Sequence, residues 1–297
     1  MQQLVSIIIP TYKGADKITA AVDSVLNQTY ENLEVIVVDD NGKGTENQLI
    51  TEKAMMKYTN NPKVKYIPHL KNKNGSAARN TGIKASTGEF LGFLDDDDVF
   101  LPEKTEKEIA LFNTLSDEYG LVYGSFVEHM TDTYSRTIEA DSTENFLFRF
   151  LCNEVIACSS TVMIRRSVLD KVVEWDESFR RHQDLEFFAR VADNYKVACI
   201  KDVCIEKFKL DRNMPKGKTF EEYRIHYLNK MQPIITQFTK KEKKHLYNIH
   251  YTDIGKCYLK EKDIKTALKW ANKTSNPLKT YLVFFKDGLS YFKRNHN

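Results

Sequence analysis

The stretch EFLGFLDDDDVFLP (residues 89–102) joins an apolar run to four consecutive aspartates. Phe90–Leu94 has the continuous apolar pattern of a strand that is buried on both faces. Four adjacent carboxylates repel one another and resist burial, so their position directly after such a strand calls for an explanation. In an extended chain alternate side chains share a face. We therefore expect Asp95 and Asp97 on one side of the chain and Asp96 on the other.

Two more apolar runs end in polar residues. Val5–Ile9 stops at Pro10-Thr11-Tyr12, and Leu33–Val38 stops at Asp39-Asp40. Helical spacing follows each run, and strands that alternate with helices predict an α/β fold with a Rossmann-like, mostly parallel sheet flanked by helices. Ligands bind beyond the carboxyl ends of such strands. The three polar strand ends are therefore expected to meet in one crevice.

The alternation weakens after about residue 115. Residues 121–126 and 161–164 have strand patterns, and residues 185–192 have a helical one. From Thr219 onward the sequence indicates helices only. We expect a catalytic domain over residues 1–215, with a nucleotide-sugar half over about 1–115 and an acceptor half over about 116–215. An all-helical extension is expected over residues 216–297.

Composition indicates an ordinary soluble globular protein of 297 residues, with 41% hydrophobic and 29% charged residues. The sequence has no long apolar segment of the kind that spans a membrane. Its five cysteines form no C-x-x-C pair, which favours a reduced, cytoplasmic setting. Residues 211–297 carry a net charge of +11, and residues 1–210 one of −8. A solvated helix face or a membrane surface would explain the basic extension; we expect no nucleic-acid partner.

The four aspartates offer oxygen ligands for a hard divalent cation. Mg²⁺ and Mn²⁺ take one or two protein carboxylates and complete their shell with water and substrate phosphate, so the acids predict a metal–diphosphate site. The alternative is a solvated turn in which Asp98 supports the helix that starts near residue 102. The spacing excludes an EF-hand, and the sequence has neither a dinucleotide-binding glycine motif after its first strand nor a P-loop.

Two longer stretches carry a family resemblance. VSIIIPTYKGADKITAAVDSVLNQTYENLEVIVVDDN (residues 5–41) and NGSAARNTGIKASTGEFLGFLDDDDVFLPEK (residues 74–104) resemble the family 2 glycosyltransferases with the GT-A fold. The resemblance covers about residues 4–115 and continues more weakly to about 210. It implies an inverting transfer of a sugar from a nucleotide-diphosphate donor, most simply a UDP-sugar, with Mn²⁺ or Mg²⁺ as cofactor. The acceptor would be a glycan or a lipid-linked hydroxyl in polysaccharide biosynthesis of the cell envelope.

The resemblance also implies roles for single residues in donor binding. It places Asp97 on the metal and Asp95 near the ribose, as the ends of a D-x-D motif. Asp96 belongs to the donor site without a defined role. The remaining donor residues would line the nucleotide pocket, contact the base or hold the donor: Pro10, Thr11 and Tyr12, then Asp40, then Arg79.

In this family an acid at the start of a late helix removes the acceptor proton. The matching residue in WDESFRRHQDLEFFARV (residues 175–191) is Asp184, preceded by Gln183 where relatives usually have Glu. Capping of the helix over 185–192 is the alternative role for Asp184. Glu186 and Asp176 are competing acids, and His182 is expected to be a bystander.

The Gln-x-x-Arg-Trp motif of processive members is absent from the sequence, which indicates a non-processive enzyme. The basic segment 207–218 is either a linker or a loop over the donor diphosphate, with Arg212 as a candidate contact. Two other functions stay open on the residues alone, a nucleotidyltransferase and a non-catalytic nucleotide- or sugar-binding module. The extension is expected to contact the inner membrane face peripherally or to form a homodimer.

Overall fold

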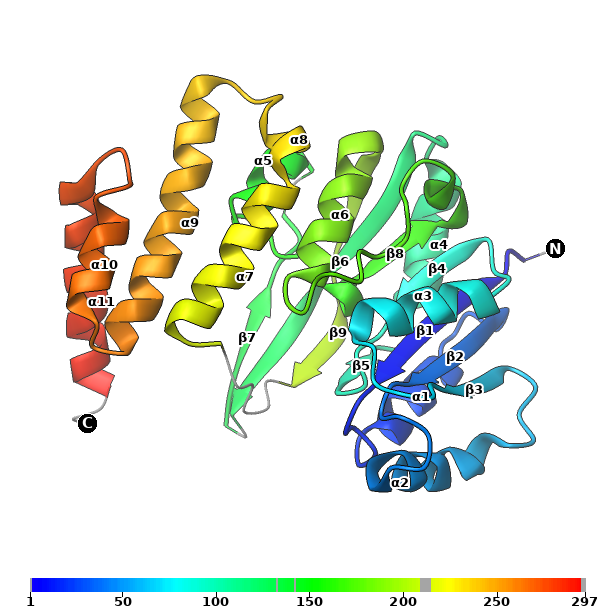
Figure 1. Cartoon of the computed structure of the whole chain (residues 1–297). Coiled ribbons are helices and arrows are strands. Elements are labelled where there is room, and N and C mark those ends of the chain that lie inside the picture. The colour runs from blue at the N-terminus through cyan, green and yellow to red at the C-terminus, as the bar shows by residue number, and fades with distance from the viewer. Residues whose placement is uncertain (1, 132, 142, 209–214, 295–297) are drawn as a thin grey trace. The chain divides into compact units, whose positions relative to one another are not determined.

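The computed structural model describes residues 2–131, 133–141, 143–208 and 215–294. The chain divides into two compact units, Met1–Asp211 and Arg212–Asn297. Strands and helices alternate in the first unit, whereas the described part of the second unit is helical (Figure 1). The expected domain boundary after residue 215 stays a prediction.

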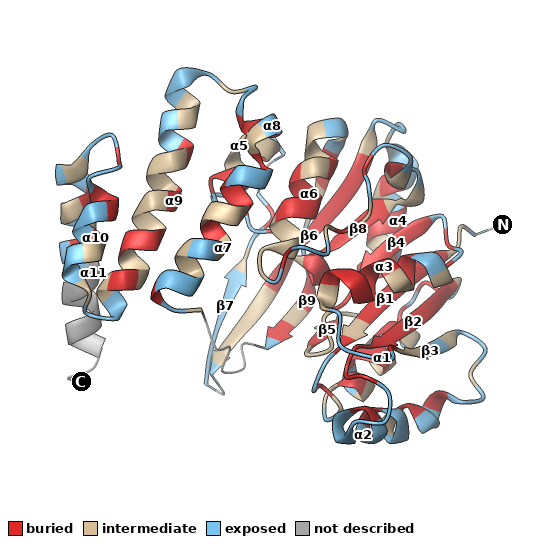
Figure 2. Cartoon of the chain, in the orientation of Figure 1, coloured by how far each residue is buried: buried red, intermediate tan, exposed pale blue. Residues whose placement is uncertain are grey.

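Four strands form the parallel part of the sheet: β1 (Val5–Thr11), β2 (Leu33–Asp39), β3 (Val64–Pro68) and β4 (Phe90–Phe93). Their order is β3-β2-β1-β4, so β1 pairs with both β2 and β4. Every residue of β2 and β4 is buried (Figure 2), which explains why both segments are apolar runs and not alternating patterns. The α/β fold expected from the sequence is confirmed.

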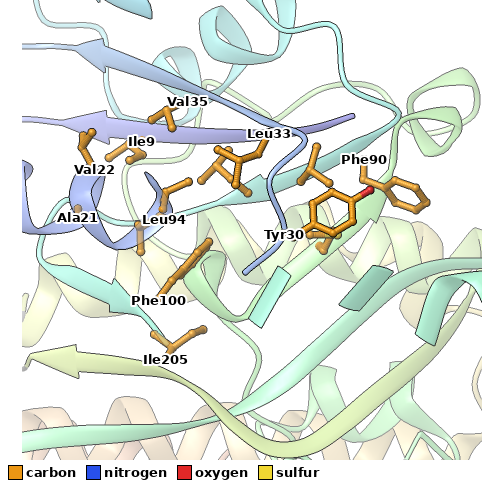
Figure 3. Close-up of a cluster of buried hydrophobic side chains, with 14 of the residues drawn as sticks. Ile9, Ala21, Val22, Tyr30, Leu33, Val35, Phe90, Leu94, Phe100 and Ile205 are labelled. Carbon is orange, nitrogen blue, oxygen red and sulfur yellow. The ribbon is translucent and has the colours of Figure 1, made fainter. Parts of the chain in front are cut away.

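Helices connect these strands: α1 (Ile18–Leu26), α2 (Glu46–Met55), a 3₁₀ turn (Met56–Tyr58), α3 (Gly75–Ala85) and, after the acids, α4 (Lys104–Thr114). The hydrophobic core draws side chains from β1, β2, β4 and α1, and Figure 3 shows that Phe100 and Ile205 belong to the same cluster. Each such side chain contributes about 1.5–3 kcal/mol when it is fully buried. The core therefore holds the early strands and the later part of the sheet together.

Five further strands extend the sheet: β5 (Asp98–Phe100), β6 (Tyr119–Thr131), β7 (Tyr134–Ile138), β8 (Val162–Arg165) and β9 (Lys196–Phe208). They continue from β4 in the order β8-β6-β9-β5, and β7 pairs with β6. Antiparallel pairs (β4–β8, β6–β8, β5–β9, β6–β7) here mix with the parallel pair β6–β9. The helices of this half are α5 (Phe146–Leu151) and α6 (Gln183–Asn194), with 3₁₀ turns at Ser159–Thr161 and Arg166–Asp170.

The second unit consists of α7 (Gly217–Lys230), α8 (Gln232–Ile235), α9 (Lys240–Lys260), α10 (Ile264–Ala271) and α11 (Pro277–Arg294). It has its own hydrophobic core, in which Trp270 and Phe284 pack with α9. A side chain at Gly255 of α9 would collide with the Phe284 ring, so glycine permits the close approach. The helical extension expected from the sequence is confirmed. Across the described residues, none of the helices combines the length and apolarity needed to cross a bilayer.

Candidate active site

The four aspartates form a tight turn between β4 and β5, and not the extended segment expected from the sequence. The N–H of Asp98 donates to the carbonyl of Asp95 at 3.1 Å. One carboxylate oxygen from each of Asp95, Asp97 and Asp98 lies within 4.8 Å of the other two. We call these three residues the acid cluster. The expected proximity of Asp95 and Asp97 is confirmed, and Asp98 joins them.

The prediction that Asp98 supports the following helix is wrong. α4 begins at Lys104, and its N-cap residue Glu103 makes no side-chain capping hydrogen bond. Asp98 is instead fully buried, accepts a hydrogen bond from Oγ of Ser160 at 2.5 Å and lies 2.5 Å from Nζ of Lys207. Burial raises the pKa of Asp98, and the contact with Lys207 opposes that rise. Asp98 therefore joins the turn to Ser160 and to Lys207 of β9.

Asp96 faces the end of β1. Its Oδ2 accepts hydrogen bonds from Oγ1 of Thr11 at 2.5 Å and from the N–H of Tyr12 at 3.3 Å. Burial raises the pKa of Asp96 to about 6. Gly14 packs against this carboxylate, and any side chain there would collide with it. Asp96 thereby fixes the acid turn to the segment Pro10–Tyr12, in which the Tyr12 side chain is half exposed.

Asp40 lies at the same edge, because its N–H donates to the carbonyl of Thr11 at 2.9 Å. The three polar strand ends therefore meet, as expected. The Asp40 carboxylate is buried, and each of its oxygens has two partners within the chain at 2.7–2.9 Å: the His69 ring and the Lys73 N–H on Oδ1, and the Asn72 side chain and the Asn74 N–H on Oδ2. It holds the segment 69–74 that leads into α3. The adjacent Asp39 accepts a hydrogen bond from the Tyr66 hydroxyl at 2.6 Å.

Arg79 extends from α3 between the acid cluster and α6. Its Nη2 lies 2.7 Å from Oδ1 of Asp95, and its Nη1 donates to Oε1 of Gln183 at 3.1 Å. The guanidinium lies over the Trp175 ring, with its carbon 4.8 Å from the ring centroid. Stacking on an aromatic face and paired hydrogen bonds orient an arginine well. Arg79 therefore couples the position of Asp95 to the start of α6.

Asp184 is the second residue of α6. The helix begins at Gln183, and the N-cap residue His182 has a left-handed backbone (φ 61°), so Asp184 is not the cap itself. Its Oδ1 accepts a local hydrogen bond from the N–H of Leu185 at 2.9 Å. Burial and then the charge of Asp95 raise the pKa of Asp184, and Arg79 opposes the rise. A raised pKa gives this carboxylate a greater affinity for a proton.

A cavity of about 240 Å³ lies beside Asp184. Asp184 lies on its wall together with Asp95 and Arg79, and the remaining wall residues are Ser159, Arg180, Arg181, His182 and Gln183. The lining is polar and carries both signs of charge. Pro10, Thr11, Tyr12, Asp96, Asp97 and Asp40 are not among its lining residues. The cavity is therefore the place where Asp95, as the one member of the acid cluster in its described wall, and Asp184 can act on one molecule.

The two competing acids are engaged elsewhere. Glu186 is buried and pairs with Arg190 one turn along α6, with Oε1 2.5 Å from Nε. Asp176 accepts a hydrogen bond from the N–H of Ser178 at 2.8 Å. Neither residue lines the cavity, whereas His182 does. Asp184 is therefore the acid of this segment with access to the cavity.

The acid cluster fits a divalent cation. Oδ1 of Asp98 is buried and has no hydrogen-bond partner in the described part of the chain. A buried carboxylate oxygen without a partner costs free energy, which a cation would recover. Two neighbouring carboxylates complete a set of hard oxygen donors of the kind that Mg²⁺ and Mn²⁺ bind. Asp97 and Asp95 would hold the ion together with Asp98.

The sequence pattern does not identify two residues of this site. Ser160 donates to Asp98 and accepts from the N–H of Asp95 at 3.1 Å, and Lys207 contacts both aspartates. No local motif marks Ser160, which lies in the 3₁₀ turn before β8. Lys207 opens the basic segment 207–218, expected from the sequence to be a linker or a loop, but Lys207 belongs to β9. Arg212, the expected diphosphate contact, lies outside the described residues.

Comparison with known proteins gives the family. The model of "Glycosyl transferase family 2" matches residues 6–173. A glycosyltransferase of Rickettsia felis is 39% identical over 123 residues, which are 41% of this chain and 19% of that protein. The amylovoran biosynthesis glycosyltransferase AmsB of Erwinia amylovora is 28% identical over 247 residues, 78% of this chain and 79% of that protein. The matches to the Rickettsia relatives span 19–60% of those proteins.

A third relative has a defined reaction in its name. The Escherichia coli UDP-Glc:alpha-D-GlcNAc-diphosphoundecaprenol beta-1,3-glucosyltransferase WfgD is 32% identical over 146 residues, 46% of this chain and 55% of that protein. Among solved structures, S. aureus TarS 1-349 in complex with UDP-GlcNAc has a TM-score of 0.61 at 18% identity, with 89% of each chain covered. The mannosyltransferase PcManGT of Pyrobaculum calidifontis, in complex with GDP-Man and Mn²⁺, has a TM-score of 0.62 at 17% identity, covering 98% of this chain and 81% of that one. These structures confirm the GT-A fold.

Proposed function

Because the chain belongs to glycosyl transferase family 2, we propose that it moves a sugar from a nucleotide-diphosphate donor to a hydroxyl acceptor with inversion at the anomeric carbon. One observation carries the proposal: Asp184 and Asp95 line the same cavity, and Arg79 lies between them. A proton acceptor and one member of the acid cluster are thus available to one substrate pair.

The proposed donor is a UDP-sugar. The base and ribose would lie along the segment Pro10–Tyr12, where the half-exposed Tyr12 ring offers an apolar face. Asp40 would contact the base in exchange for one of its present hydrogen bonds. TarS binds UDP-GlcNAc and PcManGT binds GDP-Man, so GDP-sugars are the second class to examine. Arg79 would hold the donor through its contact with Asp95.

The diphosphate would be served by the acid cluster. Asp97, with Asp95 and Asp98, would bind Mn²⁺ or Mg²⁺. A divalent cation held there supplies Lewis-acid stabilisation of the charge on the departing diphosphate. PcManGT was solved with Mn²⁺, which supports this choice for a protein of the same fold.

Asp184 is proposed as the general base. Its carboxylate would accept the proton of the acceptor hydroxyl while that oxygen attacks the anomeric carbon. The bond to the diphosphate oxygen breaks in the same displacement, which inverts the configuration at that carbon. The raised pKa of Asp184 suits the task, since it increases the affinity of the carboxylate for the transferred proton.

The proposed acceptor is a glycan or a lipid-linked sugar. WfgD acts on a GlcNAc-diphosphoundecaprenol, and AmsB belongs to amylovoran biosynthesis. By analogy we place this chain in polysaccharide biosynthesis for the cell envelope, at the cytoplasmic side of the inner membrane.

The helical unit is proposed to bind that membrane peripherally. Leu278, Leu282 and Phe285 follow helical spacing on α11 and are 74%, 63% and 66% exposed. Lys279 and Lys286 are exposed beside this apolar stripe. An apolar stripe bordered by lysines, in a segment of net charge +11, complements an anionic lipid surface. Such binding would bring the catalytic unit to a lipid-linked acceptor.

Vesicle sedimentation tests the membrane proposal. The full chain should sediment with phosphatidylglycerol vesicles and not with phosphatidylcholine vesicles. Serine at positions 278, 282 and 285 should abolish the binding, whereas serine at the exposed Leu49, Ile50 and Met56 of the first unit should leave it intact. Equal binding by both triple variants would contradict the proposal. A stripe that instead forms a homodimer would appear as a concentration-dependent mass in light scattering, lost with the α11 variant.

A donor screen tests the function itself. The protein is incubated with Mn²⁺ and a panel of UDP- and GDP-sugars, and separately with nucleoside triphosphates and sugar phosphates. Release of UDP or GDP supports the glycosyltransferase. Release of pyrophosphate from a triphosphate would instead indicate a nucleotidyltransferase.

A further inference from the structure

Lys207 stands opposite Asp98 in the antiparallel pair of β5 and β9. Its side chain is 9% exposed, and Nζ lies 2.5 Å from Oδ2 of Asp98 and 3.5 Å from Oδ2 of Asp95. Buried lysines are rare unless they are paired. The strand register and these two contacts therefore hold an ammonium group inside the acid cluster.

This ammonium contacts two of the three residues that could hold a divalent cation. Asp95 also pairs with Arg79, so two fixed positive charges face the three carboxylates. These positive charges would repel a divalent cation bound to the same carboxylates. The repulsion is strong where water is largely excluded. The three carboxylates therefore attract a divalent cation less strongly than they would without Lys207 and Arg79. A diphosphate supplies negative charge and oxygen ligands of its own, which offset the repulsion.

We propose that Lys207 is a built-in counter-cation of the acid cluster and makes tight binding of the divalent cation depend on the donor diphosphate. Without nucleotide, Lys207 neutralises and orders Asp98 and Asp95. With nucleotide, the cation enters between the acids and the phosphates. The inference rests on the proposed donor and cation, and it assigns to Lys207 a positioning role that no motif of the sequence marks.

Binding of Mn²⁺ alone to the full chain, measured by calorimetry without nucleotide, tests this role. Lys207→Met should bind Mn²⁺ at least about tenfold more tightly than the wild type, because a positive charge beside the ligands is removed. Lys207→Arg keeps the charge and should stay within about threefold of the wild type. Lys201→Met, at an exposed position of the same strand, is the matched control and should also stay within that range.

Coupling between nucleotide and cation gives the second measurement. In the wild type, UDP or GDP should tighten Mn²⁺ binding at least about tenfold, and this factor should shrink in Lys207→Met. Circular dichroism and thermal unfolding check that each variant is folded. If Lys207→Met does not fold, Lys207→Gln replaces it, since its amide still donates a hydrogen bond to Asp98.

The outcomes separate the two proposals. Equal affinity for Mn²⁺ alone in the wild type and in the folded neutral variant overturns the role of Lys207. Failure of both UDP and GDP to bind in the presence of Mn²⁺ counts against the proposed function. The comparison with Mn²⁺ alone needs no nucleotide and decides the role of Lys207 in either case.

Discussion

Nη2 of Arg79 lies 2.7 Å from Oδ1 of Asp95, and this contact joins the acid cluster to α3. Nη1 of the same guanidinium donates to Gln183, the residue before Asp184. One side chain on α3 therefore spans from the acid cluster to the first turn of α6. We therefore expect both donor binding and proton transfer to depend on Arg79.

Replacement of Arg79 should disturb both the acid cluster and the start of α6. Arg79→Gln is expected to weaken binding of UDP with Mn²⁺ by about tenfold, since the donor loses the guanidinium that would hold it. Turnover should fall by about a hundredfold, because α6 loses a tether beside the base. Calorimetry measures the first effect and steady-state kinetics the second. Arg166→Gln, a change of a partly buried arginine bonded to Gly88 and Ser86 away from the cavity, is the control. A loss confined to turnover would contradict the donor role of Arg79.

Replacement of Asp184 should remove the proposed base and little else. Asp184→Asn keeps the size of the side chain and an oxygen for the N–H of Leu185. Transfer should fall by about a thousandfold, within the usual contribution of a general base. Binding of UDP with Mn²⁺ should stay within about twofold. Glu186→Gln controls for charge on the same helix, and near-normal turnover of Asp184→Asn would remove Asp184 from the mechanism.

Turnover should depend on pH through Asp184. The base must be ionised, so the rate falls as pH drops through its pKa, and the raised pKa moves that fall to a higher pH than for an ordinary aspartate near 3.9. Gln183→Glu adds a negative charge beside Asp184. The new carboxylate would also pair with Arg79, whose positive charge opposes the rise in the pKa of Asp184. It should raise the pKa further and shift the acidic limb of the kcat profile upward. An acidic limb that Gln183→Glu leaves in place would argue that another group is being titrated.

Glu34 provides a stability prediction away from the site. Its carboxylate accepts hydrogen bonds from Ser6 and Thr87 and pairs with Lys65 at 2.9 Å. Burial alone would raise its pKa, but these partners outweigh burial and lower the pKa to about 2. Glu34→Gln should reduce the free energy of unfolding by about 2 kcal/mol at pH 7.

The sign of the pH dependence follows from the lowered pKa of Glu34. Its stabilisation is complete above the unfolded pKa near 4.5 and is lost as pH falls through the folded pKa near 2. Urea unfolding of both proteins at several pH values measures the difference between them. That difference should shrink below pH 4.5, and a constant difference would mean that ionisation of Glu34 contributes nothing.

The first half of the fold could be predicted because β2 and β4 are buried on both faces. Complete burial requires an apolar run, and that run is visible in the sequence. β9 could not be predicted in the same way. Its segment mixes Lys and Asp with apolar residues, since several of its positions are exposed. The turn at Asp95–Asp98 is expected from the sequence only as the alternative to an extended segment, because β5 forms only by pairing with β9.

The candidate site was predictable where local sequence carries it. The acid run, Arg79 and Asp184 stand in recognisable motifs, and the structure brings Asp95, Arg79 and Asp184 to one cavity. Lys207 has no such mark, since its partner Asp98 lies 109 residues away in the chain. Contacts of this kind depend on strand register, which a single sequence does not reveal.

The configuration of the transfer product tests the central claim most directly. A donor selected by the screen, such as an α-linked UDP-sugar, is incubated with acceptor and Mn²⁺, and the anomeric coupling constant of the product is read by proton nuclear magnetic resonance. The account predicts a β-linked product from the wild type and none above background from Asp184→Asn. An α-linked product, or equal product from the two proteins, would contradict single displacement with Asp184 as the base.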